Sequence, residues 1–147
     1  MNLKQKGIGL LELMLSLAII AILLVMATRY YGAASKSEKV DDTIQLISEI
    51  SVGVNSLSAA GKAPANITVN ELYNNGYLAD KRVSTDYKKI KNPWDPATDI
   101  DFEATAGTGD IKTLKFTSVA DKQCSDLAIK LAPDATCATN TLTVHIK

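Results

Sequence analysis

The chain has little of what an enzyme needs. It contains a single histidine, His145, and no Ser-His-Asp pattern, metal-ligand cluster or phosphate-cradling glycine loop. The pair Gly107 and Gly109 is typical of a turn and not of a nucleotide-binding fingerprint. His145 lies in a predicted strand, where it either faces solvent or packs. We therefore predict a protein that is not an enzyme, with no cofactor and no metal site.

The chain also lacks net charge. Its 16 Lys and Arg residues balance its 16 Asp and Glu residues, so its bulk charge does not indicate a nucleic-acid-binding domain. One stretch is locally basic. It either touches DNA or another acidic surface, or it is a solvated loop face or one side of a salt bridge between subunits. Its members are Lys81, Arg82, Lys88, Lys89 and Lys91.

Cysteine is scarce too. The two cysteines, Cys124 and Cys137, are too far apart for a CxxC redox motif. Outside the cytoplasm an even count favours one disulfide, whereas in the cytosol they stay thiols. The N-terminal segment therefore decides between these interpretations.

The N-terminal segment contains one long hydrophobic run. The range Ile8–Thr28 carries a single charge, Glu12. As a helix it is about 32 Å long, enough to cross a hydrocarbon core of about 30 Å. Lys4 and Lys6 precede the run, so the positive-inside rule places the N-terminus in the cytoplasm and the chain after Arg29 outside.

Two ordinary interpretations of this run are incomplete. A secretory signal peptide has an apolar region of about 7–15 residues and a small-residue cleavage site, and this run is longer. A plain membrane anchor leaves Glu12 unexplained, because a carboxylate at the centre of a membrane helix costs roughly 2.5–3.5 kcal/mol. Glu12 is one turn from the helix end, which lowers that cost without giving the acid a role.

A third interpretation uses the whole segment. The order Lys4-Gln5-Lys6-Gly7, then Ile8, then Glu12, then the apolar run resembles the type III leader of type IV prepilins and pseudopilins. The resemblance implies that a prepilin peptidase cuts after Gly7 and that Ile8 becomes the N-methylated first residue. It also implies that Glu12 is the assembly residue at the fifth mature position.

The resemblance gives the carboxylate a role. In a filament core the amine of Ile8 would be a buried cation, and Glu12 of the same or a neighbouring subunit would be its counter-charge. Many classical members begin with Phe and have a helix-breaking proline about twenty residues later. Here Ile8 stands first, Arg29 stands near that position and no proline precedes Pro64, which favours a type IVb-like branch.

The helical pattern continues beyond the apolar run. Tyr30 and Tyr31 suit a membrane interface, and apolar residues then recur at spacings of three and four. We predict one helix over about 8–60, roughly 80 Å long, ended by Gly61 and Pro64. Gly32 and Gly53 weaken it by about 1 kcal/mol each without ending it. The predicted stripe is Val40, Ile44, Ile47, Ile50 or Ser51, Val54 and Leu57.

The remaining chain predicts a small α+β head. We expect a short helix over about 69–74, strands over 100–104, 111–119 and 141–147, a turn over 107–110, and a helix over 122–131 capped by Asp121. Leu72, Tyr73, Tyr77 and Leu78 would dock the short helix on the long one. Trp94, between two prolines, would plug the core.

Two features of the head depend on the resemblance. It implies a disulfide between Cys124 and Cys137. Some pseudopilins bind calcium through an acidic loop in this region, but three spaced acids are weak support for a calcium site. These acids are Asp95, Asp99 and Asp101.

We therefore predict an α+β pilin fold, with a long N-terminal helix packed on a small antiparallel sheet. The predicted parts are a leader (1–7), a transmembrane and polymerisation helix (8–28), its amphipathic half (29–60) and a globular head (61–147). The resemblance implies a subunit stored in the bacterial inner membrane that then self-assembles into a surface filament. Implied uses are adhesion, motility, DNA uptake or conjugation.

The resemblance implies as partners a prepilin peptidase, an assembly ATPase, an inner-membrane platform and a secretin, while DNA remains open. Two rival functions are a type II secretion pseudopilin or minor pilin, and a monomeric membrane-anchored periplasmic binding module.

Overall fold

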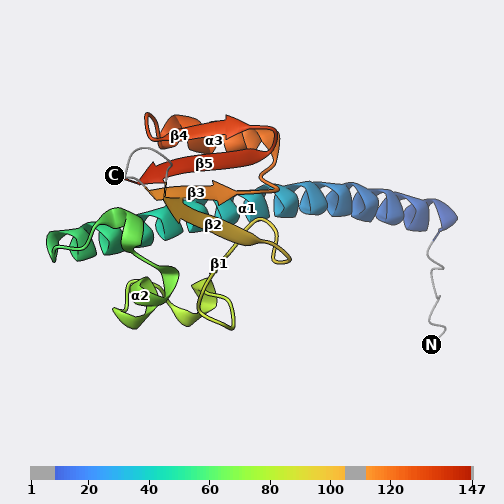
Figure 1. The fold of residues 1–147 in the computed structure, drawn as a ribbon. Helices are drawn as coiled ribbons and strands as arrows, with labels where there is room; N and C mark the ends of the chain where they lie inside the picture. Colours follow the sequence, from blue (N-terminus) through green and yellow to red (C-terminus); the bar gives the residue numbers. More distant parts are fainter. Residues whose placement is uncertain (1–8, 105–111, 147) are drawn as a thin grey trace. The chain divides into compact units, whose positions relative to one another are not determined.

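A computed structural model of the chain describes residues 9–104 and 112–146. The chain divides into two compact units between Ser37 and Glu38. In the described residues, the chain forms one long helix, then three short helical segments, three strands, a helix and two more strands (Figure 1). Every element after the long helix belongs to the second unit. This is the predicted α+β fold, a long N-terminal helix packed on an antiparallel sheet.

The long helix α1 spans Leu10–Ala59. It is apolar on all sides at first and amphipathic from Val40 onward, so only its second part buries residues. Gly61, at φ 94°, ends it, because Gly61 N–H donates to Ser58 O and Lys62 N–H donates to Leu57 O. The predicted end is therefore confirmed. The buried residues of α1 are Val40, Thr43, Leu46, Ile47, Ile50, Gly53 and Val54.

This buried set corrects the predicted stripe in part. Ile44 and Leu57 are only half-buried, while Thr43, Leu46 and Gly53 are buried although they were not assigned to the stripe. Gly53 has a packing reason. A Cβ added there would lie 2.6 Å from Leu72 Cδ2 and 3.0 Å from Tyr77 Cβ. Glycine thus lets the segment after α1 approach the helix backbone closely.

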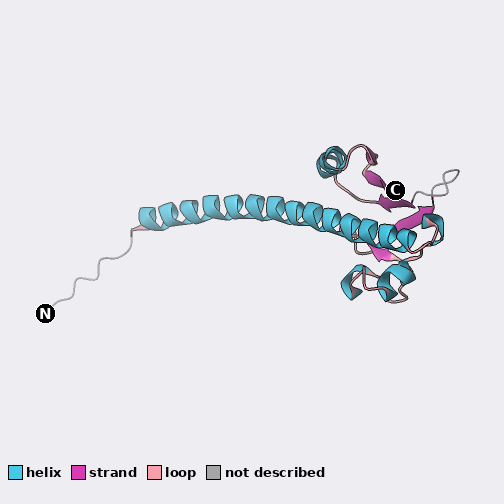
Figure 2. Ribbon diagram, turned by 90° about the vertical axis from the view of Figure 1, so that its left-hand side faces the viewer, coloured by secondary structure: helices cyan, strands magenta, loops and turns pink. Residues whose placement is uncertain are grey.

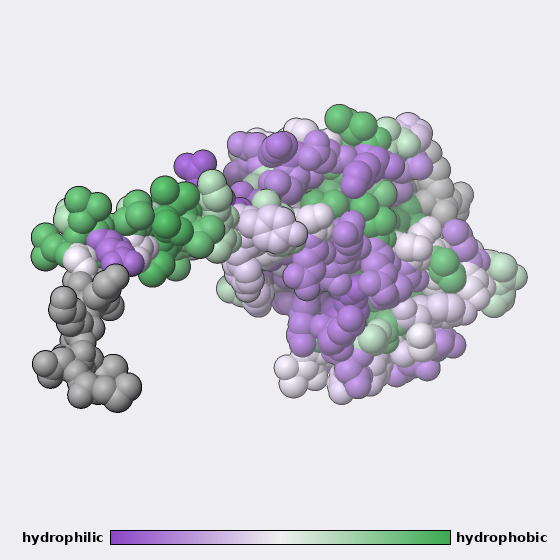
Figure 3. Space-filling model, turned by 180° about the vertical axis from the view of Figure 1, so that it is seen from behind, coloured by the Kyte–Doolittle hydropathy of each residue, from purple (hydrophilic) through white to green (hydrophobic). Residues whose placement is uncertain are grey.

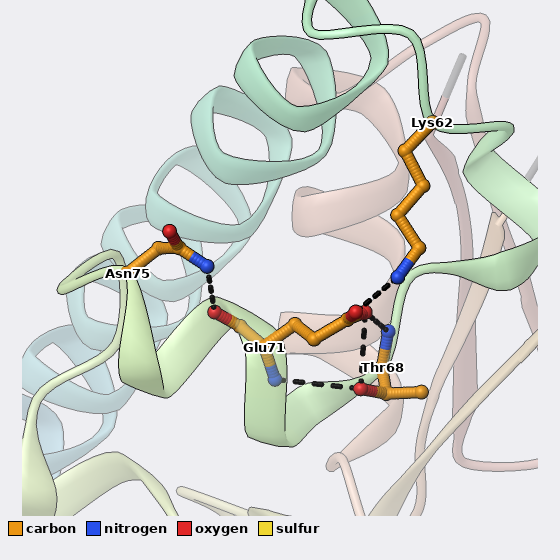
Figure 4. Close-up of polar contacts among 4 residues, drawn as sticks. All are labelled: Lys62, Thr68, Glu71 and Asn75. Carbon is orange, nitrogen blue, oxygen red and sulfur yellow. Dashed lines mark hydrogen bonds and ion pairs between the residues drawn. The ribbon is translucent and has the colours of Figure 1, made fainter.

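The short helix α2 (Val69–Asn74) matches its predicted bounds and is tied down at both ends. At its start, Thr68 Oγ1 accepts from Glu71 N while Glu71 Oε2 accepts from Thr68 N, which is a capping box (Figure 4). Lys62 Nζ pairs with Glu71 Oε1, and Asn75 Nδ2 donates to Glu71 O at 2.8 Å. The contacts of Lys62 and Thr68 hold the pKa of Glu71 below its ordinary value.

The sheet is antiparallel throughout, in the order β1-β2-β3-β5-β4. Its strands are β1 (Ile90–Lys91), β2 (Asp99–Ala104), β3 (Lys112–Phe116), β4 (Ala135–Ala138) and β5 (Thr141–Ile146). The second predicted strand, over 111–119, is too long, since β3 stops at Phe116 and Ser118 adopts φ 62°. β1 and β4 were not predicted, and the predicted turn over 107–110 lies outside the described residues.

The core lies between the sheet and the second part of α1 (Figures 1 and 2). Trp94 is buried as predicted, and its Nε1 donates to Thr43 Oγ1 at 2.9 Å. Asn92 supports this loop, because its Oδ1 accepts from Trp94 N and its Nδ2 donates to Thr117 O. The tryptophan thus has a partner on α1 itself, and its loop is fixed to the end of β3.

Helix α3 (Asp121–Lys130) and strand β4 lie on the opposite side of the second unit from α2 (Figure 2). The prediction that Asp121 caps α3 is wrong. Ala120 is the N-cap and makes no side-chain cap bond, so Asp121 is the first helical residue. A disulfide joins Cys124 on α3 to Cys137 on β4, with Cα atoms 5.7 Å apart. Closing a loop of this length stabilises a fold by about 3 kcal/mol in the chain-entropy model.

Candidate functional site

The first turn of α1 holds the acid that the sequence analysis singled out. Glu12 N and Leu13 N both donate to Gly9 O, and Ser16 Oγ donates to Glu12 O at 2.9 Å. The side chain of Glu12 is exposed and forms no ion pair with any residue that the structure describes. A helix N-terminus favours a nearby anion, and this exposed carboxylate is available for a partner.

The apolar side chains around Glu12 are not covered by any residue that the structure describes. Every described residue from Gly9 to Ala34 is exposed, and Leu10 is 79% exposed. The face of this part of α1 that is visible in Figure 3 is mostly hydrophobic. By length and composition α1 is able to cross a membrane. A surface this apolar is covered either by lipid or by protein.

Arg29 is the next charge along α1 after Glu12. It is exposed and is followed by Tyr30 and Tyr31, each 79% exposed. This order of an apolar run, a cation and two tyrosines is typical of the end of a membrane span. Gly7 and Ile8, the predicted cleavage and methylation residues, lie outside the described residues, so their geometry is not assigned.

In the second unit the basic stretch divides into two kinds of residue. Arg82 is only 4% exposed, which corrects the idea that the whole stretch is a solvated face or an external binding surface. Its Nη1 lies 2.6 Å from Asp42 Oδ1 and its Nε lies 3.6 Å from Glu49 Oε2, both on α1. Arg82 therefore fastens the segment after α2 to α1.

The other members of the basic stretch face solvent. Lys89 Nζ lies 3.5 Å from Asp99 Oδ2, and Lys81, Lys88 and Lys91 are exposed. Next to them Tyr73 and Tyr87 stack at 4.5 Å between ring centroids. Tyr73 donates from its hydroxyl to Asp80, and this bond raises the pKa of Tyr73 to about 12.

The structure does not bring the three acids considered for calcium together as one site. Asp95 accepts from Ala97 N and from Ser118 Oγ, while Asp99 pairs with Lys89. Asp101 is exposed on β2. Within ranges 9–104 and 112–146, no three His, Cys, Asp or Glu side chains converge as a metal site.

The second unit also has an open groove of about 610 Å³ along α1. Asp41 and Glu49 are the ionisable carboxylates that line it, beside Tyr77 and the apolar Ile44 and Val52. The lining contains neither a histidine nor a cysteine that would act as a base or nucleophile beside a substrate.

Comparison with known proteins identifies the chain. The model of the prokaryotic N-terminal methylation motif matches residues 2–28, and the model of the Bundlin family matches residues 32–135, more than half of the chain. The chain belongs to the Bundlin family of type IV pilins. These matches confirm the resemblance to type IV pilins that the sequence analysis based on Gly7, Ile8 and Glu12. Searches of curated proteins and of solved structures find no match for this pilin.

The family places the pilin among structural proteins, not among enzymes. Self-assembly into a filament is what membership of this family implies. Sequence reasoning missed the buried Arg82 and the Thr43 partner of Trp94. It also missed the capping box, although Thr68-x-x-Glu71 before an apolar run is its known signature.

Proposed function

We propose that this pilin is the structural subunit of a type IV pilus that polymerises through the first part of α1. Its leader is 1–7, its transmembrane and polymerisation helix is 8–28, the amphipathic half is 29–60 and the globular head is 61–147. A prepilin peptidase removes the leader and methylates Ile8. The pilin then waits as a single-pass protein of the bacterial inner membrane and ends in an extracellular filament.

The observation that carries the proposal is the uncovered apolar surface of α1 with one carboxylate in its first turn. Lipid covers this surface before assembly, and copies of the same helix cover it afterwards. Glu12 has no role in lipid, but among packed helices it is the counter-charge for the amine of Ile8. The same carboxylate therefore favours the assembled state over the membrane-bound state.

The filament needs machinery that this chain does not contain. The family implies an assembly ATPase, an inner-membrane platform protein and a secretin, and we propose these as partners. We propose adhesion, motility, DNA uptake or conjugation as the uses of this filament.

The test is the intact mass and N-terminal sequence of the protein in a fraction sheared from the cell surface. A chain that begins at Ile8, heavier by about 14 Da for one methyl group and lighter by about 2 Da for the disulfide, supports the proposal. An unprocessed chain confined to membranes contradicts it and favours a membrane-anchored binding module. A processed chain present in trace amounts beside another, abundant pilin favours a minor pilin or pseudopilin.

A further inference from the structure

Two charges of opposite sign stand alone in the apolar part of α1. Between Gly9 and Ser35 the only charged residues are Glu12 and Arg29. Both side chains are exposed, and neither pairs with another residue in the described chain. They lie on one continuous helix in one compact unit, so their separation follows from helix geometry.

This separation rules out a pair within one chain. Glu12 and Arg29 are 17 residues apart, which is about 26 Å along a helix axis. Side-chain reach does not bridge that distance. If parallel copies packed side by side at the same height, Glu12 would lie beside Glu12 and Arg29 beside Arg29, and like charges repel.

We propose that Arg29 of one copy pairs with Glu12 of a neighbouring copy, which sets an axial stagger of about 26 Å between these two copies in the filament. This inference rests on the proposed function and adds a named partner residue and a register to it. The occupant of the apolar face is thus a second copy of this chain, selected by charge complementarity.

The angular positions of the two residues allow the same contact to repeat from one copy to the next. At 3.6 residues per turn, 17 residues bring Arg29 about 100° around the helix from Glu12. Each helix therefore presents its acid to one neighbour and its cation to a different neighbour. Such a head-to-tail contact does not close on itself as a symmetric dimer, and it builds an open helical assembly.

The pairing of Glu12 with Arg29 also favours the assembled state over the membrane-bound state. In a bilayer the two residues lie near opposite ends of the span, where both side chains reach the head groups. Among packed helices the side chains no longer reach the head groups. If one helix shifts along its neighbour by one turn, each charge faces apolar side chains instead of its partner. A carboxylate has two oxygens, so Glu12 accepts from the guanidinium while still facing the amine of Ile8.

The stagger is measured by cross-linking that leaves both charges in place. Ser16→Cys and Ala33→Cys keep the 17-residue spacing, and each lies one turn beyond Glu12 or Arg29 on nearly the same helix face. The two sites are too far apart to join within one chain. Filaments of the double variant, sheared intact and oxidised, are expected to give a ladder of covalent dimers and higher multimers. Each single variant is expected to stay monomeric. The matched control, Ser16→Cys with Met26→Cys, has a 10-residue spacing on nearly the same helix faces and is expected to give no ladder.

Intact filaments without a ladder from the first pair, or with a ladder only from the control pair, overturn the stagger. If the double variant makes no filaments, a second series decides. Arg29→Gln is expected to lower the filament yield at least tenfold at an unchanged level of processed pilin in the membrane, and Arg29→Lys is expected to retain most of it. Wild-type yield from Arg29→Gln overturns the pairing. The absence of processed filaments from the wild-type chain contradicts the proposed function itself.

Discussion

At the scale of single residues, Arg82 explains how a basic loop is joined to the helix behind it. The guanidinium is buried, while its partners Asp42 and Glu49 remain partly open to solvent. Three atoms of this cluster, Arg82 Nε and Nη2 and Glu49 Oε2, have no hydrogen-bond partner among the described residues. A buried cation held mainly by charge is sensitive to the loss of either side of the pair.

Replacing this arginine is therefore expected to destabilise the head. Arg82→Ala leaves two carboxylates without their cation and leaves a void, so we expect a loss of about 3 kcal/mol in the free energy of unfolding. Urea unfolding of the detergent-solubilised pilin, followed by the fluorescence of Trp94, measures it. Lys88→Ala, at an exposed position of the same loop, is the control and is expected to stay within about 0.5 kcal/mol of wild type. Equal stability of both variants would contradict a fastening role for Arg82.

At the scale of elements, the two glycines of α1 have different roles. Gly32 has no atom within 4 Å of an added Cβ, whereas at Gly53 a Cβ would collide with Leu72, which is fully buried. We expect Gly53→Ala to lower the free energy of unfolding by about 1–3 kcal/mol despite the better helix propensity of alanine. We expect Gly32→Ala to leave it unchanged or to raise it by up to about 1 kcal/mol. Thermal unfolding followed by circular dichroism compares the two, and a stabilised Gly53→Ala variant would refute the close approach.

The start of α2 predicts a pH dependence. The pKa of Glu71 is lowered from 4.5 in the folded protein, mainly by Lys62 and then by the backbone N–H of Thr68. The carboxylate therefore contributes stability above pH 4.5, and this contribution is lost as the pH falls through the lowered pKa. Glu71→Gln is expected to be less stable than wild type at pH 7 and to approach it at pH 3.

Lys62→Met is the matched variant for this effect. It removes the first cause of the shift, so the pKa of Glu71 is expected to move back toward 4.5 in an NMR titration of its carboxyl carbon. An unchanged pKa in this variant would assign the shift to the capping box alone.

At the scale of the whole molecule, Glu12 is expected to act on assembly and not on folding. Glu12→Ala is expected to be processed and inserted normally, because the carboxylate is exposed and forms no ion pair within the described chain. Its filament yield in the sheared fraction is expected to fall at least tenfold, since the cations of packed helices lose their counter-charge. Ser16→Ala, one turn further along, removes only a bond to the backbone of Glu12 and is expected to assemble normally. Abundant fibres from Glu12→Ala would contradict this account.

Much of this fold follows from local patterns in the sequence. The period of α1, the short helix stopped by Asn75 and Gly76, and the alternation in β5 are each set by neighbouring residues, and the structure confirms these elements. The family follows from Gly7, Ile8 and Glu12 because that spacing rarely occurs by chance before an apolar helix. These features need no knowledge of distant contacts.

The features that sequence reasoning missed depend on distant contacts. β1 and β4 are too short to show alternation, and they exist because β2 and β5 pair with them. The burial of Arg82 depends on Asp42 and Glu49, which lie more than thirty positions earlier in the chain. No pattern around residue 82 distinguishes it from its exposed lysine neighbours.

The edges of the sheet have a consequence for crowding. β1 has two residues and β4 has four, and the disulfide ties β4 to α3. Short edge strands offer few free backbone groups for another strand to add to, which is a common protection against aggregation. Crowded heads can therefore collide repeatedly without their sheets pairing edge to edge.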